Sequence, residues 1–250
     1  SGSGGNITIN GGNVTATSEA FAAGIGGGQD SSGGNITING GTVTATGGQD
    51  GAGIGSGSHG SYGTITINGG SVTATGGDNG AGIGGGIGDE IGGYGGSFTT
   101  GTDGHALIFA NGGISDKSNQ NSWSGIIFDG NTGTVYGDQT LQENLKISSD
   151  KTLTVPKNTT LTVNRGVTLT NNGRITGYGT LDGEGNLVGS GTVADTIQNN
   201  LQKDSAVAVM VSTSMATYGS NVSITATISK AANAITRAAE NQVEFFVGTD

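Results

Sequence analysis

A 29-residue repeat constrains the fold of this chain more than any other feature. The segment 5–12, Gly-Asn-Ile-Thr-Ile-Asn-Gly-Gly, returns at 34–41 and, with Thr for the first Asn, at 63–70. Val-Thr-Ala-Thr from Val14 and Ala-Gly-Ile-Gly from Ala23 recur at the same interval. Three motifs that keep register over three copies predict a repeat architecture, in which each unit buries a narrow apolar strip against its neighbours.

The alternation within each repeat predicts a β-solenoid coil with three short sides. Side chains of a strand point alternately to its two faces, so one set faces the core and the other faces solvent. The third side lies around Ile25 and contributes one residue to the core. Stacking of coils builds columns such as Ile7/Ile36/Ile65 and Val14/Val43/Val72. The residues of the first coil expected to point inward are Ile7, Ile9, Val14 and Ala16, and those expected to point outward are Thr8, Thr15 and Thr17.

An asparagine precedes the Gly-Gly corner in every copy, at Asn10, Asn39 and Asn68. We expect these side chains to bond the turn backbone and one another, forming a ladder along the corner. Separate β-hairpins would also use Asn-Gly turns. They do not require a fixed 29-residue spacing, so the solenoid is the favoured interpretation.

The spacing changes along the chain and divides the predicted β-helix, residues 1–204, into three parts. The 29-residue coils cover 1–97, and wider coils with larger apolar residues cover 98–140. Short sides of six to eight residues follow over 141–197. There Ile175, Leu181, Leu187 and Val193 fall at steps of six, each two residues after a glycine, which is typical of a triangular β-helix. We expect a parallel, right-handed winding throughout.

Residues 205–250 differ in composition and predict a second module. Alternating strands are expected over 207–211, 222–228 and 243–247, with a short helix over 231–240. Three strands cannot complete an Ig-like sandwich, which needs about seven. We therefore expect a truncated Ig-like β module, and we expect the chain as a whole to be an excerpt of a longer protein.

Several segments resemble repeat regions of large cell-wall or surface proteins of Gram-positive bacteria. They are "GGNITINGGTVTATGGQDGAGIGSG", "ALIFANGGISDKSNQNSWSGIIFDGNTGTVYGD" and "KTLTVPKNTTLTVNRGVTLTNNGRITGYGTL". The tail "VSTSMATYGSNVSITATIS…VEFFVG" is similar to the first half of bacterial Ig-like repeats, which commonly follow such regions. The resemblance implies a secreted or cell-wall-attached stalk with adhesion or carbohydrate binding as its role. It supplies no functional residues.

Charge and composition exclude several partners. The net charge is −10 and the first cation is Lys117, so the chain is a poor ligand for nucleic acid and for anionic membranes. No apolar run approaches the roughly 18 residues of a membrane span, so no membrane insertion is expected. The absence of cysteine removes disulfides, a thiol nucleophile and thiolate metal sites. No cofactor or metal is expected.

Many β-helix proteins act on polysaccharides, so an enzyme has to be considered. Such a site needs clustered carboxylates or a calcium site beside a cation. Asp50 and Asp78 are one residue out of repeat register, and Asp182 with Glu184 fits exposed positions of the six-residue pattern. His59 and His105 do not recur, and neither has a partner at metal-ligand spacing. We therefore expect no enzyme.

Two surface features remain as binding candidates. The outward Thr pairs of residues 15/17, 44/46 and 73/75 should form two columns, which resemble ice-binding faces, although Thr is also an ordinary exposed strand residue. Exposed aromatic rings are the usual platform for sugars. We expect Tyr62 and Tyr94 to be exposed in glycine-rich corners, and Trp123 is a third candidate, although core packing is the favoured interpretation for it. These three are the predicted ligand-binding residues.

The sequence thus predicts a non-catalytic, extracellular surface segment that is adhesive, with host or environmental glycans and further domains of the same parent chain as partners. A purely structural spacer is the alternative, followed by a β-helix polysaccharide lyase or hydrolase and by an ice-binding face.

Overall fold

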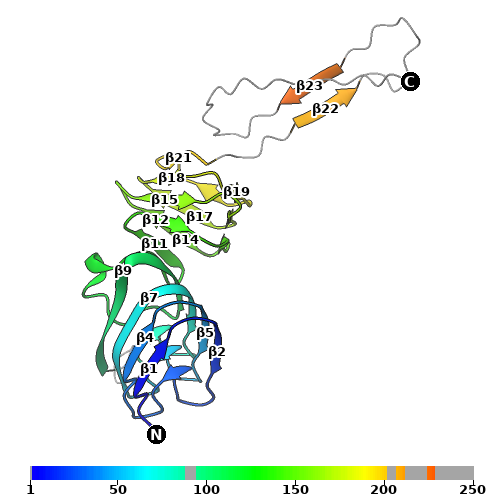
Figure 1. Ribbon diagram of the computed structural model, residues 1–250. Coiled ribbons are helices and arrows are strands. Elements are labelled where there is room, and N and C mark those ends of the chain that lie inside the picture. The colour runs from blue at the N-terminus through cyan, green and yellow to red at the C-terminus, as the bar shows by residue number, and fades with distance from the viewer. Residues whose placement is uncertain (1, 88–93, 202–206, 212–223, 229–250) are drawn as a thin grey trace, which may run out of the picture. The chain divides into compact units, whose positions relative to one another are not determined.

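The computed structural model describes residues 2–87, 94–201, 207–211 and 224–228 (Figure 1). Contacts divide the chain into two compact units, Ser1–Leu201 and Gln202–Asp250. The first unit holds every element of the β-helix, and its boundary falls three residues before the one we predict. Within the described residues, no helix is long and apolar enough to cross a membrane.

The N-terminal part of the first unit is a parallel solenoid, in which each coil corresponds to one copy of the sequence repeat. β4 pairs with β1 and β5 pairs with β2 in register, and β7 continues both sides as one long strand. A third sheet of two-residue strands, β3–β6–β8, closes the coil. The strands are β1 (Asn6–Ile9), β2 (Asn13–Thr17), β3 (Ile25–Gly26), β4 (Asn35–Ile38), β5 (Thr42–Thr46), β6 (Ile54–Gly55), β7 (Ser61–Thr75), β8 (Ile83–Gly84) and β9 (Tyr94–Asn111).

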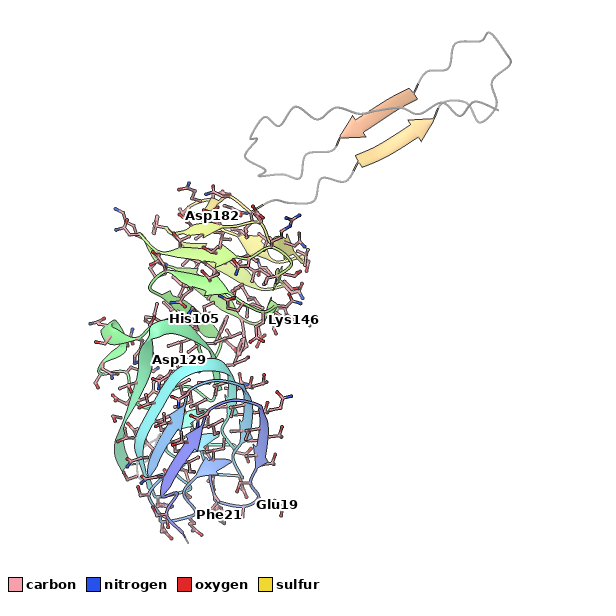
Figure 2. All side chains as sticks on the ribbon, viewed as in Figure 1. Glu19, Phe21, His105, Asp129, Lys146 and Asp182 are labelled. Carbon is pink, nitrogen blue, oxygen red and sulfur yellow. The ribbon has the colours of Figure 1, made fainter. Side chains whose placement is uncertain are left out.

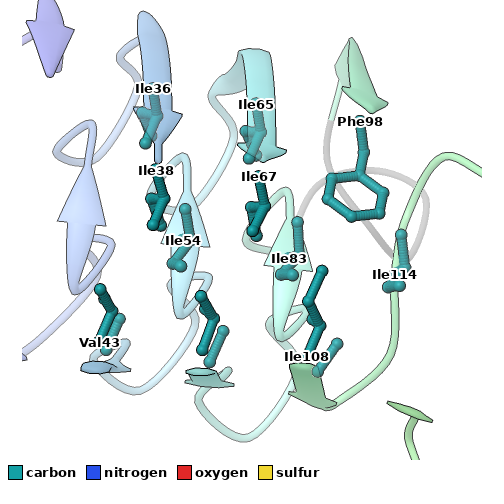
Figure 3. Packing of buried hydrophobic residues seen from close by; sticks show 14 of the residues in the cluster. Ile36, Ile38, Val43, Ile54, Ile65, Ile67, Ile83, Phe98, Ile108 and Ile114 are labelled. Atoms are coloured by element: carbon teal, nitrogen blue, oxygen red, sulfur yellow. The ribbon is translucent and has the colours of Figure 1, made fainter. Parts of the chain in front are cut away.

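The inward columns confirm the predicted alternation. Ile36 pairs with Ile7 and Ile65, and Val43 pairs with Val14 and Val72. The inward residues Ile36, Val43, Ile65 and Val72 of the second and third coils are at most 1% exposed. The inward residues of the first coil, at the end of the described stack, are half-buried. Figure 3 shows Ile36, Ile65 and Val43 of these columns together with the third-side residues Ile54 and Ile83. The parallel, in-register pairing excludes the alternative of separate hairpins.

The asparagine ladder is also present. The amide of Asn39 donates to Asn10 Oδ1 and that of Asn68 donates to Asn39 Oδ1, both at 2.7 Å. One further bond of this kind, which we did not predict, runs from Asn35 Nδ2 to Asn6 Oδ1 at 3.0 Å. The ladder and this bond join residues one repeat apart, so they fix the register of the coils from outside the core.

The core changes faces of the sheet at β9 and β10 (Gly125–Asp129). Ile108 and Ile127 pair with each other and belong to the core of the first solenoid, in line with Val72. Their neighbours Phe109 and Phe128, which point to the opposite face, pack in a second core. The outward column that holds Thr73 in the third coil therefore continues as Phe109 and becomes inward for the next solenoid.

A hairpin makes this change possible. β11 (Thr132–Tyr136) runs antiparallel to β10, and β14 then pairs parallel with β11. Gly133 faces Phe128, where an added Cβ would lie 2.5 Å from the ring. A short 3-10 turn, η1 (Gln120–Ser122), precedes the hairpin. Of the wider coils predicted for 98–140, one is present: Phe98 pairs with Ile65 and Ile108 with Val72, 33 and 36 residues apart, against 29 in the earlier coils. The hairpin of β10 and β11 stands where a further coil was expected.

The winding keeps the same hand across the junction. Strand direction inverts at the hairpin, and the core moves to the other face of the sheet, while the strands continue to stack in the order β9–β10–β11–β14. Either reversal alone would invert the hand, and the two together preserve it. The right-handed winding predicted from the sequence stays a prediction. Because the two solenoids share one hand, it holds for both or for neither.

The second solenoid is triangular, as its spacing predicts. Val193 pairs with Ile175, so these two inward residues stack one coil apart. Ile175 and Leu181 are fully buried, and Ile197 and Leu201 close the end of the core. Its strands after β11 are β12 (Gln139–Leu141), β13 (Leu145–Ile147), β14 (Thr152–Val155), β15 (Thr160–Val163), β16 (Thr168–Asn171), β17 (Arg174–Gly177), β18 (Thr180–Asp182), β19 (Asn186–Val188), β20 (Thr192–Val193) and β21 (Gln198–Asn199).

The second unit contains one described strand pair, β22 (Val207–Val211) and β23 (Ile224–Ile228), which is antiparallel. These strands coincide with two of the three that the sequence predicts. The predicted strand over 243–247 and the helix over 231–240 lie outside the described residues, so the Ig-like assignment stays a prediction.

Candidate functional site

Tyr62 is buried, which contradicts the exposure expected for it. The residue is 5% exposed and belongs to the first core. An added Cβ at Gly96 would lie 2.5 Å from the Tyr62 ring, so the glycine leaves room for the aromatic side chain. Burial, with a smaller contribution from Asp116, raises the pKa of the Tyr62 hydroxyl. The ring cannot serve as an exposed platform for a sugar.

Trp123 is 6% exposed and also packs in the first core, which confirms the core packing favoured for it and contradicts its role as a ligand-binding residue. Its ring makes edge-to-face contacts with Phe98 at 5.1 Å and Tyr136 at 5.4 Å between centroids. Its indole N–H donates to Asn119 Oδ1 at 3.0 Å. The polar turn before Trp123 therefore satisfies its only side-chain donor, and the residue anchors this end of the core.

Tyr94, the third predicted binding residue, begins β9 and pairs with Ser61. Its side chain lies outside the described part of the structure, so its role stays a prediction. Tyr178 is 72% exposed. It lies in the corner between β17 and β18 of the second solenoid.

Several carboxylates of the described residues accept hydrogen bonds that hold a corner or a turn. Asp50 accepts from Asn79 Nδ2 at 3.0 Å, which confirms that Asp78 is one residue out of register with it. Asp138 accepts the backbone N–H of Thr160 at 2.7 Å. Asp182 accepts the N–H of Gly183 at 2.9 Å. These bonds join successive coils or hold a turn, which is a structural use of the charge.

Three charged side chains secure the hairpin. Asp129 forms an ion pair with Lys117 and accepts the N–H of Ile114 at 2.9 Å. Lys151 donates to the carbonyl of Gly130 at 3.0 Å and lies 5.9 Å from the centre of the Phe128 ring. These lysines therefore stabilise the place where the chain reverses.

The outward Thr columns form as predicted. Thr44 pairs with Thr15 and Thr73, and Thr46 pairs with Thr17 and Thr75. The next strand places Phe109 and Asn111 in these columns, so the Thr pattern ends at the third coil.

A groove lies where the two solenoids meet. One hollow, of about 660 Å³, is lined by Asn39, Asn68, Gly69, Gly70, Thr100, Gly101 and His105. A second, of about 430 Å³, is lined by Gly41, Thr42, Gly70, Ser71, His105, Ala106, Leu107, Ile126 and residues 139–143. The two hollows share Gly70 and His105, so we treat them as one junction groove. Figure 2 labels His105 between the two solenoids.

Sequence reasoning missed this groove. The sequence predicts Asn39 and Asn68 only as ladder residues, and it gives His105 no role because that residue does not recur. The wall formed by Gln142 and Glu143 comes close to the first solenoid only because the hairpin moves the second core to the other face. The uninterrupted apolar run 106–110 is the one signal that could have indicated this change, because strands covered on both faces lose their alternation.

Comparison with known proteins identifies the N-terminal repeats. A family model described as a beta helix repeat matches residues 7–29, 36–58 and 65–87. These segments are the first three coils, at the interval of the sequence repeat. No curated protein and no solved structure matches the chain. The N-terminal part of the chain is therefore a β-helix repeat region.

Proposed function

We propose that this chain is a non-catalytic stalk segment of an extracellular bacterial surface protein, and that its β-helix is a rigid spacer. The continuous sheet along one side of the β-helix supports this role most directly. Its strand ladder runs without interruption from β2 through the hairpin to β20. Nine strands at about 4.8 Å give a ladder of about 40 Å. The partners of such a spacer are further domains of the same parent chain.

The junction supports rigidity because it has no polar linker between the two cores. β9 and β10 contribute residues to both, and Phe109 stacks on Phe128 at 4.8 Å with an interplanar angle of 9°. A bend there would separate these rings and break backbone bonds of the ladder. We therefore expect the first unit to behave as one body.

Hydrogen exchange of the whole chain tests this proposal. A rigid spacer requires that amides of β9, β10 and β11 exchange as slowly as those of β4 and β15. Fast exchange confined to β10 and β11 would mean two bodies joined by a hinge, and would contradict the spacer.

The non-catalytic part of the proposal rests on how the acids are used. Asp50, Asp129 and Asp138 each accept a bond that holds a corner or the hairpin. A polysaccharide panel that includes pectin and xylan, assayed for new reducing ends or unsaturated products, should show no turnover. Turnover that is lost in Asp182→Asn or Glu184→Gln would instead establish the enzyme alternative.

Glycan-directed adhesion through aromatic platforms is less well supported than the spacer. Two of the three predicted residues, Tyr62 and Trp123, are buried in the core.

A further inference from the structure

The junction groove combines a polar rim with a small apolar floor. Leu107 and Ile126 lie at its base, 8% and 3% exposed, on the face that turns toward the second core. Asn39, His105 and Glu143 lie along its rim with exposed side chains. The larger hollow, about 660 Å³, falls within the range of clefts that hold small ligands.

Several of the lining groups are held in place before any ligand arrives. Asn68 is fixed by its bond to Asn39, which is itself bonded to Asn10. Gln139 is buried and donates to the carbonyl of Tyr136 at 2.8 Å. Side chains that are already ordered lose less entropy on binding, which favours affinity.

The chemistry of the groove selects a neutral, hydroxyl-rich ligand. Amides, hydroxyls and an imidazole offer both donors and acceptors, which match the hydroxyl groups of a sugar. The described residues that line it include one carboxylate, Glu143, and neither Lys nor Arg. A phosphate, sulfate or uronic acid would therefore meet no counter-charge from these residues in a chain of net charge −10.

We infer that the junction groove binds a neutral oligosaccharide, with Asn68, His105, Gln142 and Glu143 as its polar contacts and Leu107 under the sugar ring. This site is separate from the aromatic residues predicted from the sequence. It adds a binding activity to the spacer, and the two are tested by separate measurements: hydrogen exchange of β10 and β11 reports on rigidity, whereas the titration reports on binding.

Calorimetric titration of the whole chain tests the inference. The neutral probes are maltotetraose, cellotetraose and lacto-N-tetraose, and the anionic probes are 3′-sialyllactose and a heparin tetrasaccharide. At least one neutral probe should bind saturably. His105→Ala and the pair Gln142→Ala with Glu143→Ala should each weaken it about tenfold, the effect of losing one or two hydrogen bonds. Ser71→Phe, which fills the groove from an outward strand position, should abolish binding.

Tyr178→Ala is the matched control, since it removes the exposed aromatic residue on the second solenoid and leaves the groove intact. Its affinity should equal that of the unchanged protein, and all variants should keep the same circular dichroism and unfolding midpoint. The inference is overturned if no neutral probe binds the folded chain, if only the anionic probes bind, or if the groove variants bind like the control.

Discussion

Truncation of Phe128 tests the claim that β10 is covered on both faces. Phe128 is fully buried in the second core and stacks on Phe109, whereas its neighbour Ile127 is 2% exposed in the first. Removing a buried phenyl ring costs about 3–5 kcal/mol, and shortening a buried Ile to Ala costs about 2–5 kcal/mol. Truncation of either adjacent residue should therefore be strongly destabilising. In a strand with one solvent face, only one of the two truncations would be.

The assay is urea unfolding of Phe128→Ala and Ile127→Ala, followed by circular dichroism and by the fluorescence of Trp123, the only tryptophan. Thr44→Ala is the control, because Thr44 is exposed on an outward column of the first solenoid. It should change stability by no more than about 0.5 kcal/mol. If Phe128→Ala behaves like Thr44→Ala, then β10 has a solvent face and the change of core is refuted.

Three further predictions concern coil stacking and titration. Gly63→Ala should lower the free energy of unfolding by at least about 2 kcal/mol more than Gly5→Ala does. Both glycines have a positive φ, but only at Gly63 would an added Cβ lie 2.0 Å from a backbone oxygen of the preceding coil. Equal losses in urea unfolding would contradict close coil packing. Asn39→Ala interrupts the ladder on both sides and should cost about 1 kcal/mol, with faster exchange at that corner as its signature. Burial raises the pKa of Tyr62 and Tyr136 above 10.0, so the stability they contribute is complete below pH 10.0 and is lost as the pH rises through the raised values; an ultraviolet titration in which all tyrosines ionise together at the ordinary value would refute this.

The local pattern of the chain is sufficient to predict the first solenoid. Alternation fixes which residues of 7–17 point inward, and the interval of the repeat fixes which residues stack. The Asn10–Asn39–Asn68 ladder follows from the same register. These features depend on neighbours within one coil or one coil away, so a single sequence contains the information.

Tyr62 shows where that reasoning fails. Its glycine-rich surroundings suggest an exposed corner with little core. The glycines instead lie where backbones of neighbouring coils approach closely. Because Gly96 has no side chain, the Tyr62 ring fills the space beside it. Composition alone does not distinguish an open loop from a corner that is packed too tightly for a Cβ.

The junction could not be deduced because it depends on the direction of one strand. The residues between Asp129 and Thr132 are compatible with a corner that continues the coil or with a hairpin that reverses it. The choice decides which face Phe109 and Phe128 occupy, and with it the position of Gln142 and Glu143 beside the first solenoid. The groove is therefore a consequence of tertiary structure with no motif of its own.

Nuclear Overhauser contacts around β10 distinguish a strand covered on both faces, after a reversal of chain direction, from a strand of an ordinary coil. Backbone contacts are expected between Ile126 and Val135 and between Phe128 and Gly133, as the antiparallel register requires. Contacts are also expected of the Phe128 ring with Leu153 of the second core, and of the Ile127 methyls with Ile108 of the first. Contacts of both Ile127 and Phe128 with one and the same core, or parallel pairing of residues 125–129 with 132–136, would contradict a strand covered on both faces.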